Sequence, residues 1–600
     1  MISPTRRSYH LPEISLLSAI LEIAIILILV MNFTAIVRDP SGTQRIRGGE
    51  YSYLVSSGAV ASVIYHRTGS IPLWNPFIGS GEPLFENPFS FILNPLMSLP
   101  IIWQGAVEGG KTGVMLNILL LAVGGWVLGR VLRLGWVSRV MLGLLLGGSG
   151  SVAGAIGMGF YQMGLSQAYV PWVIAGLIGT LYIPRRWPIA LLVVSTMLLI
   201  FAGTFWYALT TAIVALAVSV FAIVWWDPQT RRVQVDRWML KRLLLAGVMV
   251  IGVCAIRVLP QVATSGLVDH PKESLANSYD FSTMLTFYFS TVIASSDPQL
   301  GITAIYYHYI LPPLFALVLV FLQLIVLPIR RFQRLGDWRI IVPGALAILF
   351  FTAWGQEGTI GVRWLYDNVP FLEQWRFVGR VMAAASPWVA IIAVIWLDNL
   401  IFQLLTYIKT LNRRSFGTVF LPQAALILLL LVSLFSSLDV LGNWHRVAGT
   451  DTVDTVENQP VHYLRAQNPA KFLSVTTSSF FVYLPFYDSL TRAAYGNPDY
   501  HARGLPSTIG RNSAMSFESE YAVGIDNGFL NTIEQTGYEL IRGNDPRIKI
   551  DPTKAYLAAT WVKTDNVDQD GAQIWVDQYD RAGNVINTSY SSPVTGTQDW

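Results

Sequence analysis

Apolar runs long enough to cross a lipid bilayer are the feature that most restricts the fold of this chain. A transmembrane helix needs about 20 mostly apolar residues, and about eleven such runs can be placed along the sequence. Their approximate bounds are 14–37, 112–132, 138–157, 167–183, 188–203, 205–226, 243–262, 307–328, 340–355, 380–402 and 419–440. Only 13% of the residues are charged and 53% are hydrophobic, which excludes an ordinary soluble enzyme. The sequence predicts a polytopic α-helical membrane protein.

Arginine and lysine gather in every second loop between these runs. The basic residues that share a side with the N-terminus are Arg130, Arg133, Arg139, Arg185, Arg186, Arg231, Arg232, Arg237, Lys241, Arg242, Arg330, Arg331, Arg334, Arg339, Lys409, Arg413 and Arg414. Since cytoplasmic loops carry such an excess, we expect a cytoplasmic N-terminus, and eleven crossings place the C-terminus outside the cell membrane. A net charge of +4 gives no reason to expect a nucleic-acid partner.

The composition changes at about residue 441, where the apolar runs stop. Residues 1–440 form the predicted transmembrane domain, with a long first extracytoplasmic loop at 38–111 and smaller outer loops near 263–306 and 356–379. Residues 441–600 mix polar residues, turn formers and strand-like pieces such as "AYLAATWVKT". We expect this tail to fold as an extracytoplasmic soluble α/β domain that becomes strand-rich toward its end.

Three features inside the apolar runs have simple physical interpretations. Cys254 is the only cysteine, so a disulfide framework and a cysteine-based zinc site are both excluded. The glycine series "GLLLGGSGSVAGAIGMG" fits close helix–helix packing better than a phosphate-binding loop. Glu22, in the first run, is expected to pair within the helix bundle or to reach the inner interface.

His66 and His270, in the outer loops, lack a second ligand at metal-like spacing, so no metal residue is assigned.

A single acid, Glu50, stands where the first outer loop turns helical. The pattern "YSYLVSSGAVASVIYHRTG" that follows it fits an amphipathic helix on the membrane surface. One interpretation makes Glu50 a carboxylate that caps this helix, because the helix dipole favours a negative charge there. The loop continues as "GSIPLWNPFIGSGEPLFENPFSFILNPLMSLP", and its density of Pro, Gly and Asn predicts turns rather than regular structure.

The order of these segments resembles the first outer loop of YfhO-like bacterial membrane proteins, relatives of the GT-C glycosyltransferases. In those proteins an acid follows the first helix and a "PLWNPxxGxGxP" segment comes next. "FYQMGLSQAYVPWVIAGL", "RVLPQVATSG" and "VPFLEQWRFVGRVMAAASPWVAIIAVIWLDNL" extend the resemblance over most of residues 1–440. It implies a GT-C-like fold and a transferase. The donor would be a polyprenyl-phosphate-linked sugar, and the acceptor an extracytoplasmic glycan, lipid or protein.

The resemblance also implies roles for individual residues. The family's loop acid falls on Glu50, which would act as general base toward the acceptor hydroxyl. Relatives usually carry Asp at this position. Because Glu is also a carboxylate, the general base is retained, but the different side-chain length leaves open its reach and any role in holding a divalent metal. Arg376 and Arg380, four residues apart in "WRFVGR", would stabilise the departing lipid phosphate or anchor the helix end at lipid headgroups.

Five further residues are candidates for substrate binding. Arg257 lies within an apolar run, where a charge is costly and often functional. Glu82 and Glu86 belong to the first loop, where turn formation is the simpler explanation, and Trp74 and Asn75 belong to its "PLWNP" segment.

Two other functions compete with the transferase. A transporter or flippase of lipid-linked sugars would also need intramembrane charges and a surface open to lipid. A noncatalytic assembly subunit would keep the fold and use the tail to bind a partner. In all three cases membrane lipids surround the transmembrane domain.

Overall fold

The structure is a computed structural model that describes most of the predicted membrane helices and parts of the tail. The described residues are 13–34, 44–46, 58, 61, 62, 64–66, 69–75, 82–85, 90–157, 165–203, 206–227, 231–265, 338–354, 383–411, 450–452, 471, 472, 520, 521, 533–535, 538–540, 564–572, 575–579, 585–590 and 592–598. The chain divides into two compact units. The first contains residues 1–51 and 84–452, and the second contains residues 52–83 and 453–600.

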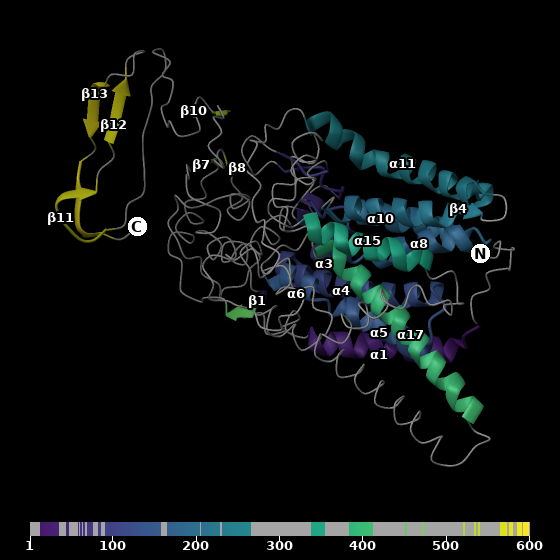
Figure 1. The fold of residues 1–600 in the computed structure, drawn as a ribbon. Coiled ribbons are helices and arrows are strands. Elements are labelled where there is room, and N and C mark those ends of the chain that lie inside the picture. The colour runs from purple at the N-terminus through teal and green to yellow at the C-terminus, as the bar shows by residue number, and fades with distance from the viewer. Residues whose placement is uncertain are drawn as a thin grey trace. The chain divides into compact units, whose positions relative to one another are not determined.

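The described part of the first unit is a bundle of helices (Figure 1). They are α1 (Leu16–Phe33), α3 (Pro95–Gln104), α4 (Ala106–Val131), α5 (Trp136–Gly147), α6 (Gly150–Gly157), α8 (Val170–Tyr182), α9 (Trp187–Phe201), α10 (Trp206–Ile223), α11 (Arg237–Ser265), α15 (Trp338–Trp354) and α17 (Ser386–Leu411). Each predicted span on described residues coincides with one of these helices, or with the pair α5 and α6. The predicted spans 307–328 and 419–440 lie outside the described residues.

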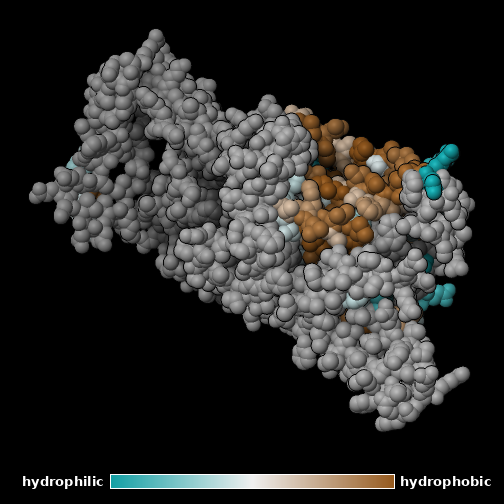
Figure 2. All heavy atoms as spheres, viewed as in Figure 1, coloured by the Kyte–Doolittle hydropathy of each residue, from teal (hydrophilic) through white to brown (hydrophobic). Residues whose placement is uncertain are grey.

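The surface of this bundle has the character of a membrane-embedded protein. Three stretches of the described helices are long and apolar enough to cross a bilayer: Gly109–Val131, Trp136–Ala153 and Arg237–Ala263. The outer face of α11 exposes Val248, Ile251 and Leu259 by 69%, 71% and 65%. Figure 2 shows this apolar surface in brown. Exposing so large an apolar surface to water would be unfavourable, so the chain is a helical membrane protein.

Glycine lets α5 approach its neighbours closely, as predicted from the glycine series. A Cβ atom added at Gly143 would lie 2.8 Å from Ile26 Cδ1 of α1 and 2.9 Å from the carbonyl oxygen of Ala122 in α4. A Cβ atom at Gly147 would lie 2.7 Å from the Ala122 side chain. The packing role of the glycine series is therefore confirmed at these two positions.

The end of the first outer loop differs from the prediction of turns without regular structure. Residues Pro95–Gln104 form α3, which begins at the N-cap Asn94. The Asn94 side-chain oxygen accepts a hydrogen bond from the Leu96 backbone N–H at 3.1 Å. Proline at the first helical position lacks only an N–H that has no intrahelical partner, so Pro95 begins this helix rather than preventing it.

The helix in the predicted span 205–226 ends earlier than expected, at Ile223.

Short strand pairs complete the described structure. In the first unit β1 (Gln44–Ile46) pairs with β6 (Thr450–Thr452), and β4 (Val224–Asp227) pairs with β5 (Arg232–Val235). The second unit contains the pair β2 (Trp74–Asn75) and β3 (Glu82–Pro83), and in the tail the strands β7 (Lys471–Phe472), β8 (Glu520–Tyr521), β9 (Ile533–Gln535), β10 (Tyr538–Leu540), β11 (Thr564–Ala572), β12 (Trp575–Tyr579), β13 (Val585–Tyr590) and β14 (Val594–Gln598). The longest of these tail strands lie at its end, and the predicted α/β domain stays a prediction.

Candidate functional site

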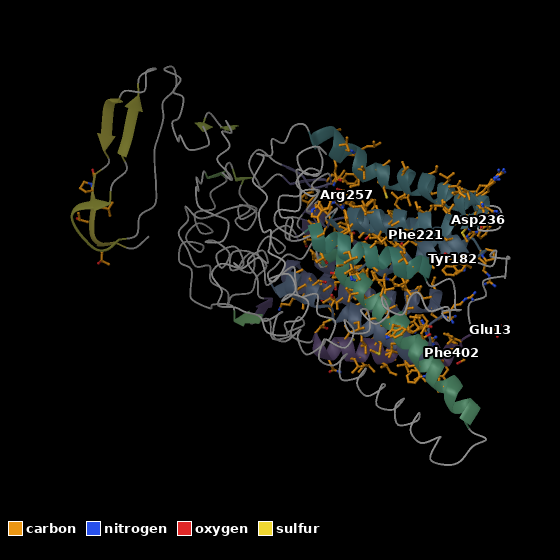
Figure 3. The ribbon with its side chains drawn as sticks, in the orientation of Figure 1. Glu13, Tyr182, Phe221, Asp236, Arg257 and Phe402 are labelled. Atoms are coloured by element: carbon orange, nitrogen blue, oxygen red, sulfur yellow. The ribbon has the colours of Figure 1, made fainter. Side chains whose placement is uncertain are left out.

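The helical unit has two chemically different ends. Arg257 lies at one end, and Glu13, Tyr182, Asp236 and Phe402 lie at the other (Figure 3). The helix ends and the connections between helices at the second end carry Arg130, Arg133, Arg185, Arg186, Arg231, Arg232, Arg237 and Lys241. We call the second end the basic end and the first end the polar end. At the polar end, residues 90–94 of the first outer loop lead into α3 of the bundle.

Hydrogen bonds tie the loops of the basic end together. Arg242 of α11 donates from Nε to the Thr180 carbonyl oxygen at 2.8 Å and from Nη2 to the Arg185 carbonyl oxygen at 2.6 Å. The Gly135 N–H, in the turn between α4 and α5, donates to Asp398 Oδ1 of α17 at 2.7 Å. The starts of α5, α9 and α11 therefore lie at one end of the bundle with the middle of α17.

Glu22 makes a buried ion pair near this basic end. Its Oε1 accepts from Arg139 Nη2 at 2.6 Å and its Oε2 accepts from Arg139 Nε at 2.8 Å. Trp126 Nε1 adds a bond to Oε2 at 2.7 Å, so one carboxylate joins α1, α4 and α5. Of the two expectations for Glu22, the structure shows pairing within the bundle. Arg139 was expected in an inner loop, and it instead lies inside α5, because Glu22 supplies the partner that its burial requires.

Arg257 is the predicted site residue whose contacts the structure describes. It lies in α11 and is 1% exposed. Its Nη1 donates to the carbonyl oxygens of Phe201 at 2.7 Å and Ile200 at 3.2 Å, at the end of α9. Its Nη2 donates to the Ser90 carbonyl oxygen at 2.8 Å, just before α3. Arg257 therefore holds the outgoing part of the first loop against two helices.

A second set of buried side chains fixes the same part of the loop. Asn94 is 0% exposed, and its Nδ2 donates to Asn117 Oδ1 of α4 at 3.2 Å. The Tyr169 hydroxyl, at the start of α8, donates to Asn94 Oδ1 at 2.8 Å. The Asn117 side chain in turn donates from Nδ2 to the Gly113 carbonyl oxygen at 2.8 Å. The beginning of α3 is thereby held by side chains of two different helices.

A third polar cluster surrounds the interruption between α5 and α6. Ser149 Oγ lies 2.8 Å from Ser151 Oγ and 3.0 Å from Ser386 Oγ, which belongs to the start of α17. Gln167 Nε2 donates to Ser151 Oγ at 3.1 Å, and the Tyr207 hydroxyl donates to Gln167 Oε1 at 3.1 Å. Each of these side chains is buried. The cluster joins α6, α10 and α17 in an otherwise apolar bundle.

The hydrogen-bonded side chains of the polar end can hold the loop and the helix ends in place, but among the described residues they do not form a metal centre. Amide and hydroxyl side chains dominate the polar end, and they fix backbone geometry without supplying a strong base. Among the described residues, no group of three or more His, Cys, Asp or Glu side chains is placed to hold a metal ion.

The predicted site residues fall into three groups. Glu50, Glu86, Arg376 and Arg380 lie outside the described residues. Trp74, Asn75 and Glu82 form the β2–β3 pair of the second unit, where the Asn75 backbone lies opposite that of Glu82. Arg257 belongs to the first unit and has the contacts described above. The substrate-binding roles of these residues stay predictions.

Sequence reasoning missed the residues that surround the end of the first loop. Asn94, Gln167, Tyr169 and Tyr207 were not candidates, yet they carry the polar clusters. Two signals were present: Asn94 directly precedes a proline that can begin a helix, and "SQAY" interrupts an apolar run with polar residues.

No protein-family model matches the chain, and no curated protein matches it significantly. Solved structures give weak similarities. The apo oligosaccharyltransferase of Archaeoglobus fulgidus aligns with a TM-score of 0.47, 14% identity and coverage of 84% of this chain and 64% of that one. The arabinofuranosyltransferase AftD from Mycobacteria (mutant R1389S, class 1) aligns with a TM-score of 0.46 and 15% identity, and the alignment covers 86% of this chain and 34% of that one. Apo ArnT from Cupriavidus metallidurans aligns with a TM-score of 0.42 and 13% identity, and the alignment covers 78% of this chain and 84% of that one.

Two of these three proteins transfer sugars, by name. The chain spans less than two thirds of the archaeal enzyme and about a third of AftD. With TM-scores below 0.5, these similarities establish neither a family nor an activity for this chain.

Proposed function

We propose that this chain is a membrane glycosyltransferase. It would transfer a sugar from a polyprenyl-phosphate-linked donor to an extracytoplasmic glycan, lipid or protein acceptor. Its membrane domain would be of the GT-C type and YfhO-like, as the sequence resemblance implies. The donor would reach the site from the bilayer, and the acceptor from the aqueous side.

The observation that carries this proposal is the anchoring of the first outer loop at the polar end. Arg257 and Asn94 hold the end of that loop against α4, α8, α9 and α11 through buried hydrogen bonds. A two-substrate transfer gains its rate from holding the reacting groups in a fixed geometry. A loop fixed in this way suits a site at the membrane surface, and the same loop carries Glu50.

Within this proposal Glu50 removes the proton from the acceptor hydroxyl, and Arg376 and Arg380 stabilise the negative charge that develops on the lipid phosphate. Arg257 contributes by positioning the loop, and its contact with the donor phosphate is a prediction. Trp74, Asn75, Glu82 and Glu86 are proposed to contact the substrates. A divalent metal remains compatible with the resemblance.

The β1–β6 pair supports the proposed orientation of the chain. β1 follows the first membrane helix, and β6 follows the last predicted span. Because their backbones are hydrogen-bonded, residues 44–46 and 450–452 must lie on one side of the membrane. This pairing supports an even number of crossings between them, and so the proposed odd total when α1 is included. With the basic end facing the cytoplasm, the tail would be extracytoplasmic.

Cysteine labelling tests this orientation. In a Cys254→Ala background, a membrane-impermeant maleimide added to intact cells should modify Ser57→Cys and Asn497→Cys. It should not modify Gln229→Cys, in the predicted cytoplasmic segment that connects β4 to β5 in the sequence. Labelling of Gln229→Cys in intact cells would contradict the odd number of crossings.

The transferase proposal is tested with the purified full-length protein in proteoliposomes. Polyprenyl-phosphate-linked glucose, mannose and galactose, each radiolabelled in the sugar, are supplied in turn together with a cell-envelope extract as acceptor source. We expect one donor to be consumed, with release of unlabelled polyprenyl phosphate and appearance of label in the acceptor fraction. Failure to consume any of them, in a protein that remains folded, would count against the proposal.

One observation favours a second candidate, a flippase for lipid-linked sugars. The helix that begins at Trp136 is interrupted at Gly148 and Ser149, about 18 Å along its axis, and a buried polar cluster lies at the interruption. Interrupted helices of this kind form binding sites in many transporters. A fluorescent lipid-linked sugar that changed leaflet in the proteoliposomes, with its sugar still attached, would favour the flippase.

A further inference from the structure

The starts of α9 and α11 bring basic residues together at the basic end. Arg242 of α11 donates from Nη2 to the carbonyl oxygen of Arg185, just before α9, at 2.6 Å. This bond fixes residues 185 and 186 beside the first turns of α11. Figure 3 labels Tyr182, at the end of α8, and Asp236, just before α11, at this same end. The basic residues of these segments therefore lie at one place on the bundle.

Four of these basic side chains are exposed and have no acidic partner in the described structure. They are those of Arg185, Arg186, Arg237 and Lys241, which we call the α9–α11 cluster. None of the four side chains forms a hydrogen bond or an ion pair with a described residue. The neighbouring acid, Asp236, instead accepts hydrogen bonds from two backbone N–H groups of the first turn of α11, at 2.9 and 3.1 Å. The cluster is therefore a local excess of positive charge that attracts an anion.

Arg242 holds the cluster in shape and aromatic side chains mark its depth. The Arg242 Nε donates to the Thr180 carbonyl oxygen at 2.8 Å, and its guanidinium carbon lies 4.7 Å from the centre of the Trp238 ring. Trp238 and Trp187, at the starts of α11 and α9, are both exposed. Exposed tryptophan at helix ends is typical of the interface between membrane and water. The cluster therefore lies at the level of lipid headgroups.

An exposed apolar strip continues from the cluster along α11. Residues three and four apart share a face of a helix. The residues that follow Lys241 on its face are Leu244, Leu245 and Val248, which are exposed by 60%, 53% and 69%. Figure 2 shows hydrophilic residues beside the apolar surface at this end. A ligand that matches this face has a negatively charged head and apolar chains.

From these observations we propose that the α9–α11 cluster binds an anionic glycerophospholipid. The lipid phosphate contacts the four basic side chains, and the acyl chains lie along the exposed strip of α11. Basic sites between membrane helices recognise anionic headgroups in this way. Arg242 is a positioning residue, because it joins α11 to the ends of α8 and α9.

The proposed lipid is distinct from the proposed sugar donor. The cluster lies at the opposite end of the helical unit from Arg257 (Figure 3), where the first outer loop is held. The inference therefore does not rest on the proposed transferase function, and it can be tested by binding alone.

Lipid affinity is measured by native mass spectrometry on the purified full-length protein in a neutral detergent. Phosphatidylglycerol and phosphatidylcholine with identical acyl chains are titrated in turn. One Lys or Arg near an anionic headgroup changes the affinity by about fivefold. Arg186→Gln/Lys241→Gln should therefore weaken phosphatidylglycerol binding by roughly 30-fold and leave phosphatidylcholine binding unchanged. Both side chains are exposed, so the fold should persist.

Arg130→Gln/Arg133→Gln is the matched control. It removes the same number of basic charges at the same end, but from the connection between α4 and α5. Figure 1 shows α5 and α11 on different sides of the bundle. Because salt screens charges beyond about 8 Å, the control should weaken phosphatidylglycerol binding by less than about twofold. Equal losses in the two double variants would overturn the specific site.

Fluorescence quenching locates the bound lipid. In a Cys254→Ala background, a dye is attached to Ile251→Cys, about one turn beyond the strip, or to Leu349→Cys on the exposed face of α15. Liposomes of phosphatidylcholine contain a small fraction of chain-brominated phosphatidylglycerol or phosphatidylcholine. The glycerol lipid should quench the dye at position 251 at a roughly tenfold lower fraction, and the two lipids should differ by less than about twofold at position 349. Equal quenching by the two lipids at position 251 would overturn the proposal.

Two competitors identify the occupant. Inorganic phosphate has the anionic group without chains, and the single chain of polyprenyl phosphate covers less of the strip than two acyl chains do. Neither, at equal concentration, should displace phosphatidylglycerol from the detergent-solubilised protein. Displacement by inorganic phosphate would indicate a site for aqueous anions, and displacement by polyprenyl phosphate a site for the donor lipid. Either result would overturn the proposal.

Discussion

The two ends of the helical unit each bury an arginine, but they satisfy it differently. At the basic end, Arg139 forms two hydrogen bonds with the Glu22 carboxylate. At the polar end, Arg257 donates to the backbone carbonyl oxygens of Ser90, Ile200 and Phe201. The Glu22 side chain that binds the first arginine can be removed by mutation, and only the Arg139 Nη1 bond to the Leu134 carbonyl oxygen, at 2.7 Å, goes to backbone. The hydrogen bonds described for the second go to backbone, which no substitution at those three positions removes.

This difference separates fold stability from loop placement. The Glu22–Arg139 pair joins three helices whose positions the membrane packing also defines. Arg257 instead joins α9 and α11 to Ser90, in the loop that leads to α3. We therefore expect changes at the basic end to affect mainly the stability of the bundle, and changes at the polar end to affect both stability and the proposed reaction.

The largest expected effect on stability comes from breaking the ion pair. Glu22→Leu or Arg139→Leu alone should lower the free energy of unfolding by about 3 to 5 kcal/mol, because each leaves a buried charge without its partner. The change is measured by denaturant titration in detergent micelles. The double variant Glu22→Leu/Arg139→Leu should recover most of the loss. A double variant as unstable as the sum of the two single variants would contradict the paired-charge account.

Arg257→Met should have a smaller effect on stability, about 2 to 3 kcal/mol, because three carbonyl oxygens, that of Ser90 fully buried, lose a charged donor. Arg242→Met is the matched control at the basic end. It also loses two bonds to carbonyl oxygens, but water reaches the half-exposed Arg242 site and replaces them. Arg257→Met should in addition slow transfer, whereas Arg242→Met should not. Equal transfer rates in the two variants would contradict the claim that Arg257 positions the first outer loop for transfer.

The smallest expected effect concerns the glycines. Gly143→Ala should destabilise the protein by about 1 to 2 kcal/mol, since the new methyl group meets Ile26 and the Ala122 carbonyl oxygen. Gly247→Ala in α11 is the control, because nothing lies within 4 Å of its added Cβ atom. The control should be neutral or more stable by up to about 1 kcal/mol, as helix propensity predicts. The same denaturant titration measures both, and equal destabilisation would contradict the packing role of Gly143.

Much of the helical unit follows from local properties of the sequence. Apolar runs located the helices because hydrophobic length is a local quantity. The pairing of Glu22 was also predictable, since a carboxylate in an apolar run requires a partner. The partner itself was not identified, because Arg139 had been assigned to a loop beside a helix end.

The remaining contacts depend on features that the sequence does not display. The described partners of Arg257 include three backbone carbonyl oxygens, which every residue type possesses, so no residue type indicated these bonds. The helix α3 was missed because the proline content of its sequence suggested turns. The β1–β6 ladder joins residues about 400 positions apart, and three-residue strands carry no periodic signal. Of the described part of the candidate site, sequence reasoning identified Arg257 but not the polar side chains Asn94 and Tyr169 that hold the same loop.

The role of Glu50 is the central claim, and one measurement tests it most directly. Transfer is measured with purified, folded Glu50→Gln protein and the donor identified in the proteoliposome assay. The substitution keeps the size of the side chain and removes the base, so turnover should fall by roughly two to four orders of magnitude while donor binding persists. Glu13→Gln, an exposed carboxylate change at the basic end, should retain full turnover. Wild-type turnover by the Glu50→Gln protein would contradict the account and direct the search for the base to Glu82 and Glu86.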